Sequence, residues 1–290
     1  MSESESYQWE RVSILLCSAV RGGYSPHFKQ SERALEAWCR SQGIVFDTRE
    51  VVEAPIDAAR DVLAAAFLTA TKPAGGPYSH CLMVDAGVGF KVETIKQLIT
   101  ADEPFTAAAV PLRRHDLEKV AAQGDVGAGS CFAIKLTRET RETGRHKLVA
   151  KGGAPFMEVD GIGGALICFR PEVLRRIFEA HPELRHKDGF GYFLPTVMNE
   201  RGDSHVDLMR YALQALRRED NPTARQRIIE DALSVNHNDF ERIGEDIAFC
   251  NRWRALDTAD QPAKIWLLAD APLMHEGHGY FVGNVASIFS

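Results

Sequence analysis

The sequence predicts an α/β fold with a mostly parallel central sheet flanked by helices. Its first 110 residues alternate four times between a short apolar run and a helical pattern, which is typical of parallel strands joined by crossover helices. The third run, residues 81–84, is continuously apolar, as in a strand buried on both faces. No repeat or linker divides the chain, so we expect one domain over residues 1–290.

Capping residues mark the first predicted helix. Ser25 and Pro26 are typical of an N-cap and a first helical position, and Gly43 is typical of a helix end. The other elements expected here are strands over residues 11–20, 44–52 and 105–110, a helix from Asp57 with an apolar stripe that includes Val62, and a helix over 92–99.

The second half has a different pattern. Residues 131–136 and 146–150 flank Arg-Glu-Thr-Gly and predict a hairpin. Residues 161–169 are glycine-rich and then apolar, and a helix is expected from Pro171. Residues 203–239 mix acids and bases in a polar, helical pattern, which indicates a solvated insertion.

Composition excludes several classes of protein. The net charge of −6 argues against nucleic-acid binding through the overall field. Six scattered cysteines without a Cys-x-x-Cys pair predict a reducing, cytoplasmic location and no zinc site. No apolar run is long enough to cross a bilayer, and the polar, acidic N-terminus does not resemble a signal peptide.

Asp85 is the first candidate site residue. It follows the buried run 81–84, and open α/β sheets bind ligands at the carboxyl ends of such strands. Gly87 and Gly89 would allow a sharp turn and the close approach of a ligand. The alternative is an ordinary turn after a core strand.

Further candidates lie near the C-terminus. Glu245 and Asp246 begin a predicted helix, where acids either complement the helix dipole or point into a pocket as general bases. A strand over residues 264–268 follows. His275 and His278 then lie among glycines, a position that suits a ligand-binding histidine as well as a structural one.

Taken in order, these segments resemble the GT-A type of nucleotide-sugar-dependent glycosyltransferases, which have a Rossmann-like sheet. The similar segments are Ala59-Arg60-Asp61, Asp85-Ala86-Gly87 in place of an Asp-x-Asp element, residues 107–114, 161–170 and 245–254, and His275-Glu276-Gly277. The resemblance covers most of residues 11–284 but not the insertion. It implies a nucleotide-binding half over residues 11–115 and an acceptor-binding, catalytic half over 116–290.

The resemblance also implies a set of ligands and roles. The donor would be a nucleoside-diphosphate sugar, and the acceptor a hydroxyl of a glycan, a lipid-linked molecule or another compound. Asp85 and Gly87 would lie at the diphosphate, and Asp85 and His275 at a Mn²⁺ or Mg²⁺ ion. Arg60 and Arg21 would face the phosphates. Asp246 would deprotonate the acceptor if the reaction inverts the anomeric centre, and Glu245 would position the acceptor.

One departure from the family pattern is Gly87, which replaces the second acid of Asp-x-Asp. Three outcomes follow: Asp85 and His275 hold the metal with water and phosphate oxygens, Arg60 and other cations neutralise the diphosphate, or transfer activity is lost. The chain would in the last case be a nucleotide- or glycan-binding relative. A nucleotidyltransferase on a similar sheet is a further alternative. The choice between inversion and retention, the donor's sugar and base, the acceptor and the oligomeric state are left open.

Overall fold

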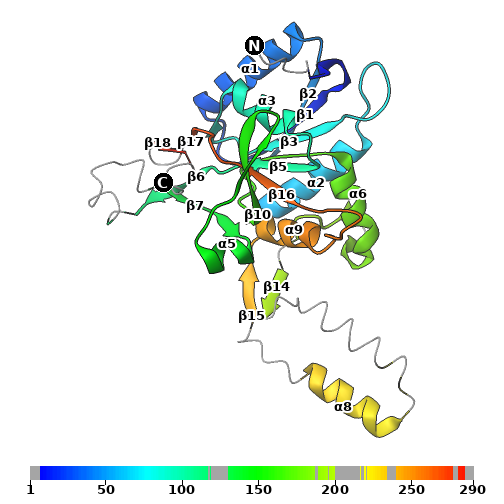
Figure 1. The fold of residues 1–290 in the computed structure, drawn as a ribbon. Coiled ribbons are helices and arrows are strands. Elements are labelled where there is room, and N and C mark those ends of the chain that lie inside the picture. The colour runs from blue at the N-terminus through cyan, green and yellow to red at the C-terminus, as the bar shows by residue number, and fades with distance from the viewer. Residues whose placement is uncertain are drawn as a thin grey trace.

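The computed structural model shows an α/β fold with a mixed central sheet flanked by helices (Figure 1). The structure describes residues 7–116, 118, 130–186, 189–194, 196–199, 216, 219, 221–233, 240–276 and 280–284. Within these residues, no helix combines the length and the apolar character that a membrane crossing needs.

The central sheet has nine strands in the order β2-β1-β3-β11-β5-β16-β10-β8, and β9 pairs with β10 at its side. These strands are β1 (Ser13–Val20), β2 (Val45–Val52), β3 (His80–Val84), β5 (Phe105–Ala108), β8 (Ile134–Leu136), β9 (Leu148–Lys151), β10 (Ala154–Ile162), β11 (Leu166–Phe169) and β16 (Ile265–Leu268). Strands from the 11–115 and 116–290 halves therefore share one sheet.

Helices α1 and α3 cover one face of this sheet and helices α2, α6 and α9 cover the other, whereas the short strands form separate small sheets. The helices are α1 (Pro26–Ser41), α2 (Ile56–Thr69), α3 (Val92–Thr100), α5 (Arg138–Thr143), α6 (Pro171–Ala180), α8 (Pro222–Leu233) and α9 (Glu245–Arg254). The short strands are β4 (Val88–Gly89), β6 (Pro111–His115), β7 (Ser130–Phe132), β12 (Arg185–His186), β13 (Gly189–Phe190), β14 (Thr196–Asn199), β15 (Phe240–Ile243), β17 (Leu273–Glu276) and β18 (Tyr280–Gly283).

The predicted strand–helix alternation of the first half is confirmed, but the expectation of a mostly parallel sheet is wrong. β1 pairs in parallel with β2 and β3, and β5 with β16. In contrast, β11 lies antiparallel between β3 and β5, and β10 is antiparallel to its three partners. The apolar runs of the second half predict strands, but without crossover helices they do not fix strand direction.

The predicted hairpin over residues 131–150 is also wrong. The Thr137 hydroxyl accepts from the Thr140 amide and Gly144 adopts a left-handed φ of 64°, so the intervening residues form α5. The hairpin lies one segment later, where β9 and β10 pair across Gly152 and Gly153. Both glycines have positive φ, as a tight two-residue turn requires.

Two apolar cores lie on opposite faces of the sheet, because successive strand residues point to alternate faces. Leu15 and Met83 belong to the core under α2, α6 and α9, whereas Leu16 and Leu82 belong to the core under α1 and α3. Figure 1 shows these two groups of helices on the two sides of the sheet. The central strands are therefore buried on both faces, as predicted.

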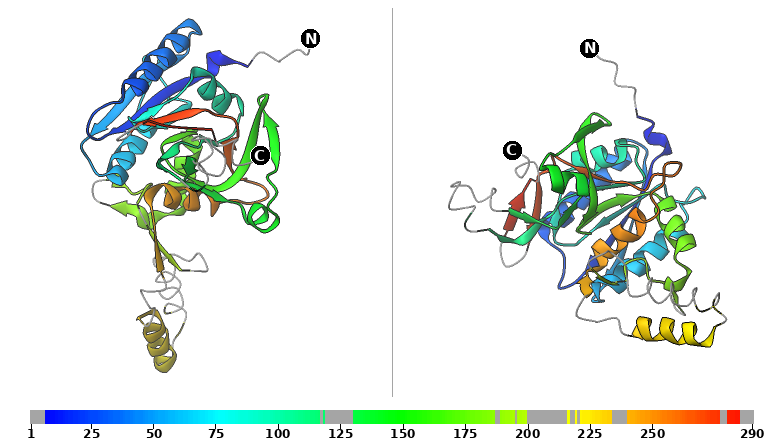
Figure 2. Two further views of the ribbon diagram at one scale, coloured as in Figure 1. Left: turned by 90° about the vertical axis from the view of Figure 1, so that its left-hand side faces the viewer. Right: turned by 60° about the horizontal axis from the view of Figure 1, so that its bottom comes forward.

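Most of the predicted insertion over residues 203–239 lies outside the described residues. Its described helix, α8, begins at Pro222, where the Asn221 side chain accepts from the amides of Thr223 and Ala224. The helix lies away from the sheet in all three ribbon views (Figures 1 and 2).

Candidate functional site

Two hollows meet at the carboxyl end of β3. The first, here called the acidic hollow, has a volume of about 190 Å³ and is lined by Arg60, Asp85, Glu245, Asp246 and His275 among others. The structure thus brings to one place five side chains that the sequence singled out. Their chemistry is three carboxylates, one guanidinium and one imidazole.

The second hollow, here called the arginine hollow, has a volume of about 490 Å³. Its lining includes Arg21, Gly87, Arg113 and Glu276, and it shares Asp85 with the acidic hollow. Arg21 follows β1 just as Asp85 follows β3. Because these strands are parallel neighbours, both residues lie at the same edge of the sheet.

Arg60 forms ion pairs with two carboxylates of the acidic hollow. Its side chain is only 3% exposed; Nη2 lies 2.9 Å from Asp85 Oδ1 and Nη1 lies 2.9 Å from Glu245 Oε1. One guanidinium therefore joins the end of β3 to the start of α9. A Cβ added to Gly164 would lie 2.7 Å from Nη1, so this glycine makes room for the arginine.

The burial of Arg60 corrects the predicted stripe of α2. Arg60 lies on the inward face with Leu63 and Phe67, one turn apart, whereas Val62 is 56% exposed. Residue type alone would place the valine inside and the arginine outside. The two carboxylates reverse this order, because they compensate the charge that is removed from water.

The acidic hollow holds more negative than positive charge. Burial raises the pKa of Glu245, Asp246 and Asp85 raise it further, and Arg60 opposes them. Burial disfavours the charge of Arg60, but Asp85 and Glu245 outweigh burial and raise its pKa. Arg60 is thus a fixed cation whose two terminal nitrogens are already bound to carboxylates.

Asp246 is held differently from its neighbour. Its Oδ1 accepts from the Ile247 amide at 2.7 Å, and its Oδ2 accepts from the Gly164 amide at 3.4 Å. The residue lies in the first turn of α9, where the helix dipole favours a negative charge. Asp246 therefore presents a carboxylate to the hollow without a direct bond to Arg60.

His275 is fixed in one orientation by two bonds. Its Nδ1 lies 2.9 Å from the Pro111 carbonyl oxygen, and its Nε2 lies 3.1 Å from Arg113 Nε. A carbonyl only accepts and a guanidinium only donates, so Nδ1 carries the proton and Nε2 accepts. Burial lowers the pKa of His275, and Arg113 lowers it further, against the Pro111 bond and Asp85.

These bonds do not suit the metal site that the family resemblance implies. The Nε2 lone pair that would bind a metal accepts from Arg113, and Asp85 Oδ1 accepts from Arg60. Within the described part of the chain, no group of three or more His, Cys, Asp or Glu side chains could hold a metal ion. Asp85 and His275 therefore line the same hollow, but Asp85 Oδ1 and His275 Nε2 accept from arginines.

Arg113 is the site residue that sequence reasoning missed. It belongs to β6, and a Cβ added to Gly87 would lie 2.9 Å from its Nη2. The signal available was its position just after an apolar strand, within Pro111-Leu-Arg-Arg, which the family comparison treated only as part of a strand. His278, the other histidine considered, lies outside the described residues.

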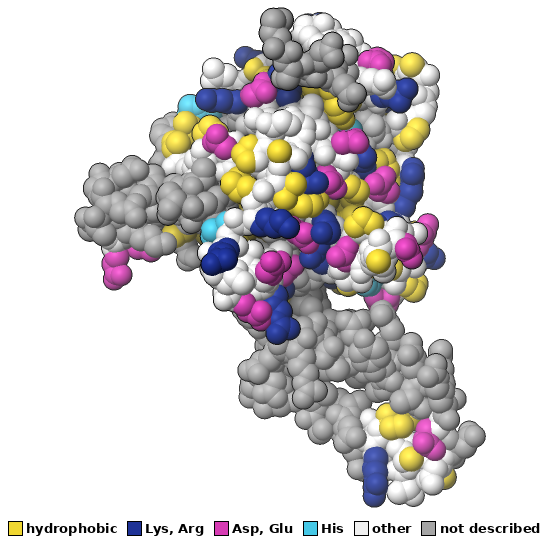
Figure 3. All heavy atoms as spheres, in the orientation of Figure 1, with side chains coloured by type: hydrophobic (Ala, Val, Ile, Leu, Met, Phe, Trp, Pro, Cys, Tyr) yellow, Lys and Arg dark blue, Asp and Glu magenta, His cyan; other side chains and the backbone are white. Residues whose placement is uncertain are grey.

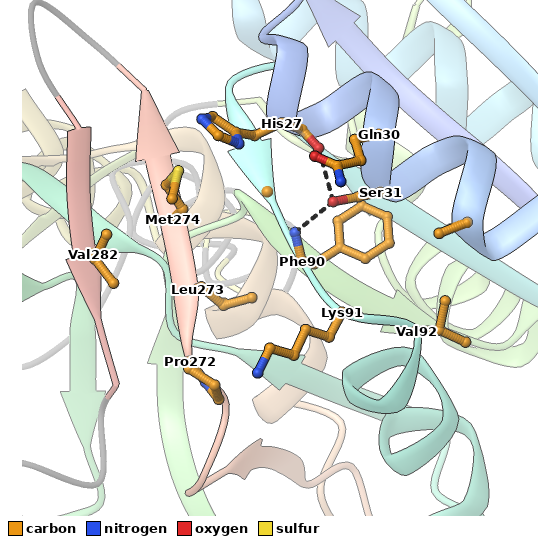
Figure 4. A pocket seen from close by; sticks show the side chains of 12 residues that line it. His27, Gln30, Ser31, Phe90, Lys91, Val92, Pro272, Leu273, Met274 and Val282 are labelled. Carbon is orange, nitrogen blue, oxygen red and sulfur yellow. Dashed lines mark hydrogen bonds between the residues drawn. The ribbon is translucent and has the colours of Figure 1, made fainter.

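A third hollow, of about 620 Å³, lies on the other side of β17 (Figure 4). Met274 lines this hollow, whereas its neighbour His275 lines the acidic hollow. Ser31 bridges its walls by donating to the His27 carbonyl and accepting from the Phe90 amide. No Asp or Glu is among its described lining residues, so it lacks the chemistry of the other two.

One face of the described part of the molecule carries a mixed distribution of charge. On the face seen in Figure 3, Lys and Arg side chains lie interspersed with Asp and Glu.

Comparison with known proteins gives a distant structural likeness. No family model and no curated protein matches the chain. A solved structure described as a glycosyltransferase involved in the glycosylation of the major capsid of PBCV-1 is similar at 11% identity and a TM-score of 0.25. The match covers 59% of this chain and 67% of that chain. A likeness this distant shows no activity for this chain.

Proposed function

We propose that this protein is a glycosyltransferase that moves a sugar from a nucleoside-diphosphate sugar to an acceptor hydroxyl. The observation that carries the proposal is the meeting of Asp85, Glu245 and Asp246 around one hollow, beside a second hollow lined by arginines. Acids distant in the sequence thus adjoin a space at the carboxyl ends of β1 and β3 that is lined by Arg21 and Arg113 as well as by Asp85 and Glu276. Open α/β sheets bind ligands at this place.

The two hollows match the two ends of such a donor. The arginine hollow, at about 490 Å³, has the size typical of a small-molecule site and would hold the nucleoside diphosphate. The smaller acidic hollow would hold the sugar and the acceptor hydroxyl. Its carboxylates would stabilise positive charge on the sugar as the bond to the diphosphate breaks.

Asp246 is the proposed general base. The bond between the anomeric carbon and the β-phosphate oxygen breaks, and its electron pair leaves with the diphosphate. The acceptor oxygen forms the new bond, and its proton passes to Asp246. Glu245 is bound to Arg60 at 2.9 Å and is better placed to position the acceptor than to take a proton. This assignment suits inversion; in a retaining reaction the same acids would orient the acceptor.

A panel of nucleotide sugars tests the proposal. The protein is incubated with each donor and with glycan and lipid-linked acceptors, in EDTA and in Mn²⁺, and released nucleoside diphosphate and the glycosylated acceptor are measured. We expect acceptor-dependent release for one donor. Pyrophosphate released from a nucleoside triphosphate would instead indicate nucleotidyl transfer.

A second candidate is a nucleotide- or glycan-binding relative without transfer activity. The observation that favours it is Gly87, where the implied acid is missing and the Arg113 guanidinium takes up the space. Tight binding of a nucleotide sugar with no turnover on any acceptor would support this candidate and contradict the first.

A further inference from the structure

We propose that Arg113 takes the place of a metal ion at this site and binds the diphosphate of the donor. The inference rests on the proposed function, because it names the group that would hold the leaving diphosphate. It concerns a residue that the family resemblance does not assign, and it starts from the position of one guanidinium.

The first observation is that Gly87 stands where the Asp-x-Asp pattern has an acid, and that Arg113 occupies the space beside it. Gly87 has no side chain, and the place its Cβ would occupy lies 2.9 Å from Nη2 of Arg113. An acid at this position would point into the space that the guanidinium fills. The chain thus has a positive side chain where the Asp-x-Asp pattern would have a negative side chain and its metal.

The second observation is the orientation of Arg113. Pro111 fixes the His275 ring through Nδ1, and His275 Nε2 accepts from Arg113 Nε at 3.1 Å. The bond at Nε leaves the other end of the guanidinium, Nη1 and Nη2, directed away from the histidine. Two parallel N–H groups at this end suit two oxygens of a phosphate.

The third observation is that the nearby acids are bound elsewhere. Asp85 Oδ1 accepts from Arg60, and the Glu276 carboxylate accepts from the Ser25 hydroxyl. Arg113 is exposed, and it forms no ion pair with an acid of the described part of the chain. Its charge is therefore available to an anion, in contrast to that of Arg60.

Arg21 extends the same positive wall. It lines the arginine hollow beside Gly22 and Gly23, whose φ values of 73° and 102° carry the backbone around the rim. Arg21 likewise forms no ion pair with the described acids. Arg21 and Arg113 provide two positive charges, which is the charge of one divalent cation. Asp85 and Glu276 line the same hollow, where they accept from Arg60 and Ser25.

Calorimetry with inorganic pyrophosphate and with UDP, GDP, CDP and ADP tests the inference. Each probe is titrated into the full chain in EDTA and in MnCl₂. We expect binding of at least one nucleoside diphosphate in EDTA, and Arg113→Ala should weaken it on the order of tenfold to a hundredfold, since a charge-assisted hydrogen bond is lost. Arg113→Lys should recover part of the loss by keeping the charge.

Arg40→Ala is the matched control. Arg40 is an exposed arginine whose side chain is 77% accessible and pairs with Glu36 on α1, so its removal should leave binding unchanged. Circular dichroism of each variant shows whether the fold is retained.

A second pair of variants places an acid at position 87, with and without Arg113. Gly87→Asp combined with Arg113→Ala would restore an Asp-x-Asp element in space that Arg113 has left. We expect this double variant to bind the diphosphate only with Mn²⁺, and Gly87→Asp alone to bind it weakly in both solutions because its carboxylate pairs with Arg113.

The outcomes separate the inference from the proposed function. Binding that requires Mn²⁺ in the unmodified chain, or binding in EDTA that Arg113→Ala leaves unchanged, would overturn the role of Arg113 and leave glycosyl transfer standing. No binding of any diphosphate in either solution would overturn both.

Discussion

Arg60 lines the acidic hollow and Arg113 lines the arginine hollow, and the two side chains differ in burial and in bonding partners. Arg60 is 3% exposed and bound to two carboxylates, whereas Arg113 is exposed and bound to a neutral histidine. A buried arginine needs acids to compensate its desolvation, so its charge is used within the protein. An exposed arginine fixed only at Nε keeps its charge for a ligand. Burial therefore separates a structural cation from a binding cation.

The largest effect is expected for Asp246→Asn, which tests the acidic hollow. An amide cannot accept the acceptor's proton, so transfer should fall by about 10²–10⁴-fold. Calorimetry should show nearly unchanged donor binding, because the arginine hollow is intact. Asp85→Ala, on both hollows, should instead weaken donor binding. The exposed Asp260→Asn is the control, and full turnover in Asp246→Asn would remove this residue from the mechanism.

Removing each arginine compares the two hollows directly. Arg60→Ala leaves the half-buried carboxylates of Asp85 and Glu245 without their partner, and we expect the free energy of unfolding to fall by up to about 3–5 kcal/mol. Arg113→Ala removes an exposed side chain, and we expect a change within about 0.5 kcal/mol. Urea denaturation measures both values. Equal losses for the two variants would contradict the distinction drawn here.

Gly164→Ala tests the space reserved for Arg60. The added Cβ would lie 2.7 Å from Nη1, and the guanidinium is held by two acids and cannot move away freely. We expect a loss of about 1–3 kcal/mol in the free energy of unfolding, the usual effect of overpacking. In an Arg60→Ala background the same substitution should have little further effect. Additive losses in this double-mutant cycle would show that Gly164 acts independently of Arg60.

The smallest effect is a difference in pH dependence between two side chains of the acidic hollow, Glu245 and His275. The pKa of Glu245 is raised in the folded protein, chiefly by burial, so the folded state binds more protons and stability falls as pH rises above 4.5. The pKa of His275 is lowered, again chiefly by burial, so the unfolded state binds more protons and stability rises as pH approaches 6.5 from below.

Two variants separate these contributions. Glu245→Gln should remove the fall in unfolding free energy above pH 4.5, and His275→Gln should remove the rise towards pH 6.5. Urea denaturation at a series of pH values measures both. A change of the same sign in the two variants would show that the assignments of burial and charge are wrong.

The sequence predicts the central fold well where residue type and local geometry agree. Ser25, Pro26 and Gly43 mark the limits of α1, and the apolar run before Asp85 is a central strand, because capping and alternation depend only on neighbouring residues. Strand direction in the second half was predicted wrongly, since pairing partners are chosen by contacts between distant segments.

The sequence identifies the acids and Arg60 as site candidates, but it does not predict that they bind one another. Arg60 and Glu245 are 185 residues apart in the sequence, and no local sequence pattern indicates that they pair. The metal expectation rested on residue types at Asp85 and His275. In the structure Asp85 Oδ1 and His275 Nε2 accept from arginines, and a single sequence gives no sign of these bonds.

By itself, the sequence determined the strands and helices of the first half and most of the candidate side chains, because these follow from hydrophobic period, capping and turn chemistry over a few residues. Only the tertiary structure decided that Arg60 is buried between Asp85 and Glu245, and that Arg113 lies over Gly87. These arrangements depend on which distant charges meet and how much water is excluded, and such electrostatic balances exist only once the chain has folded.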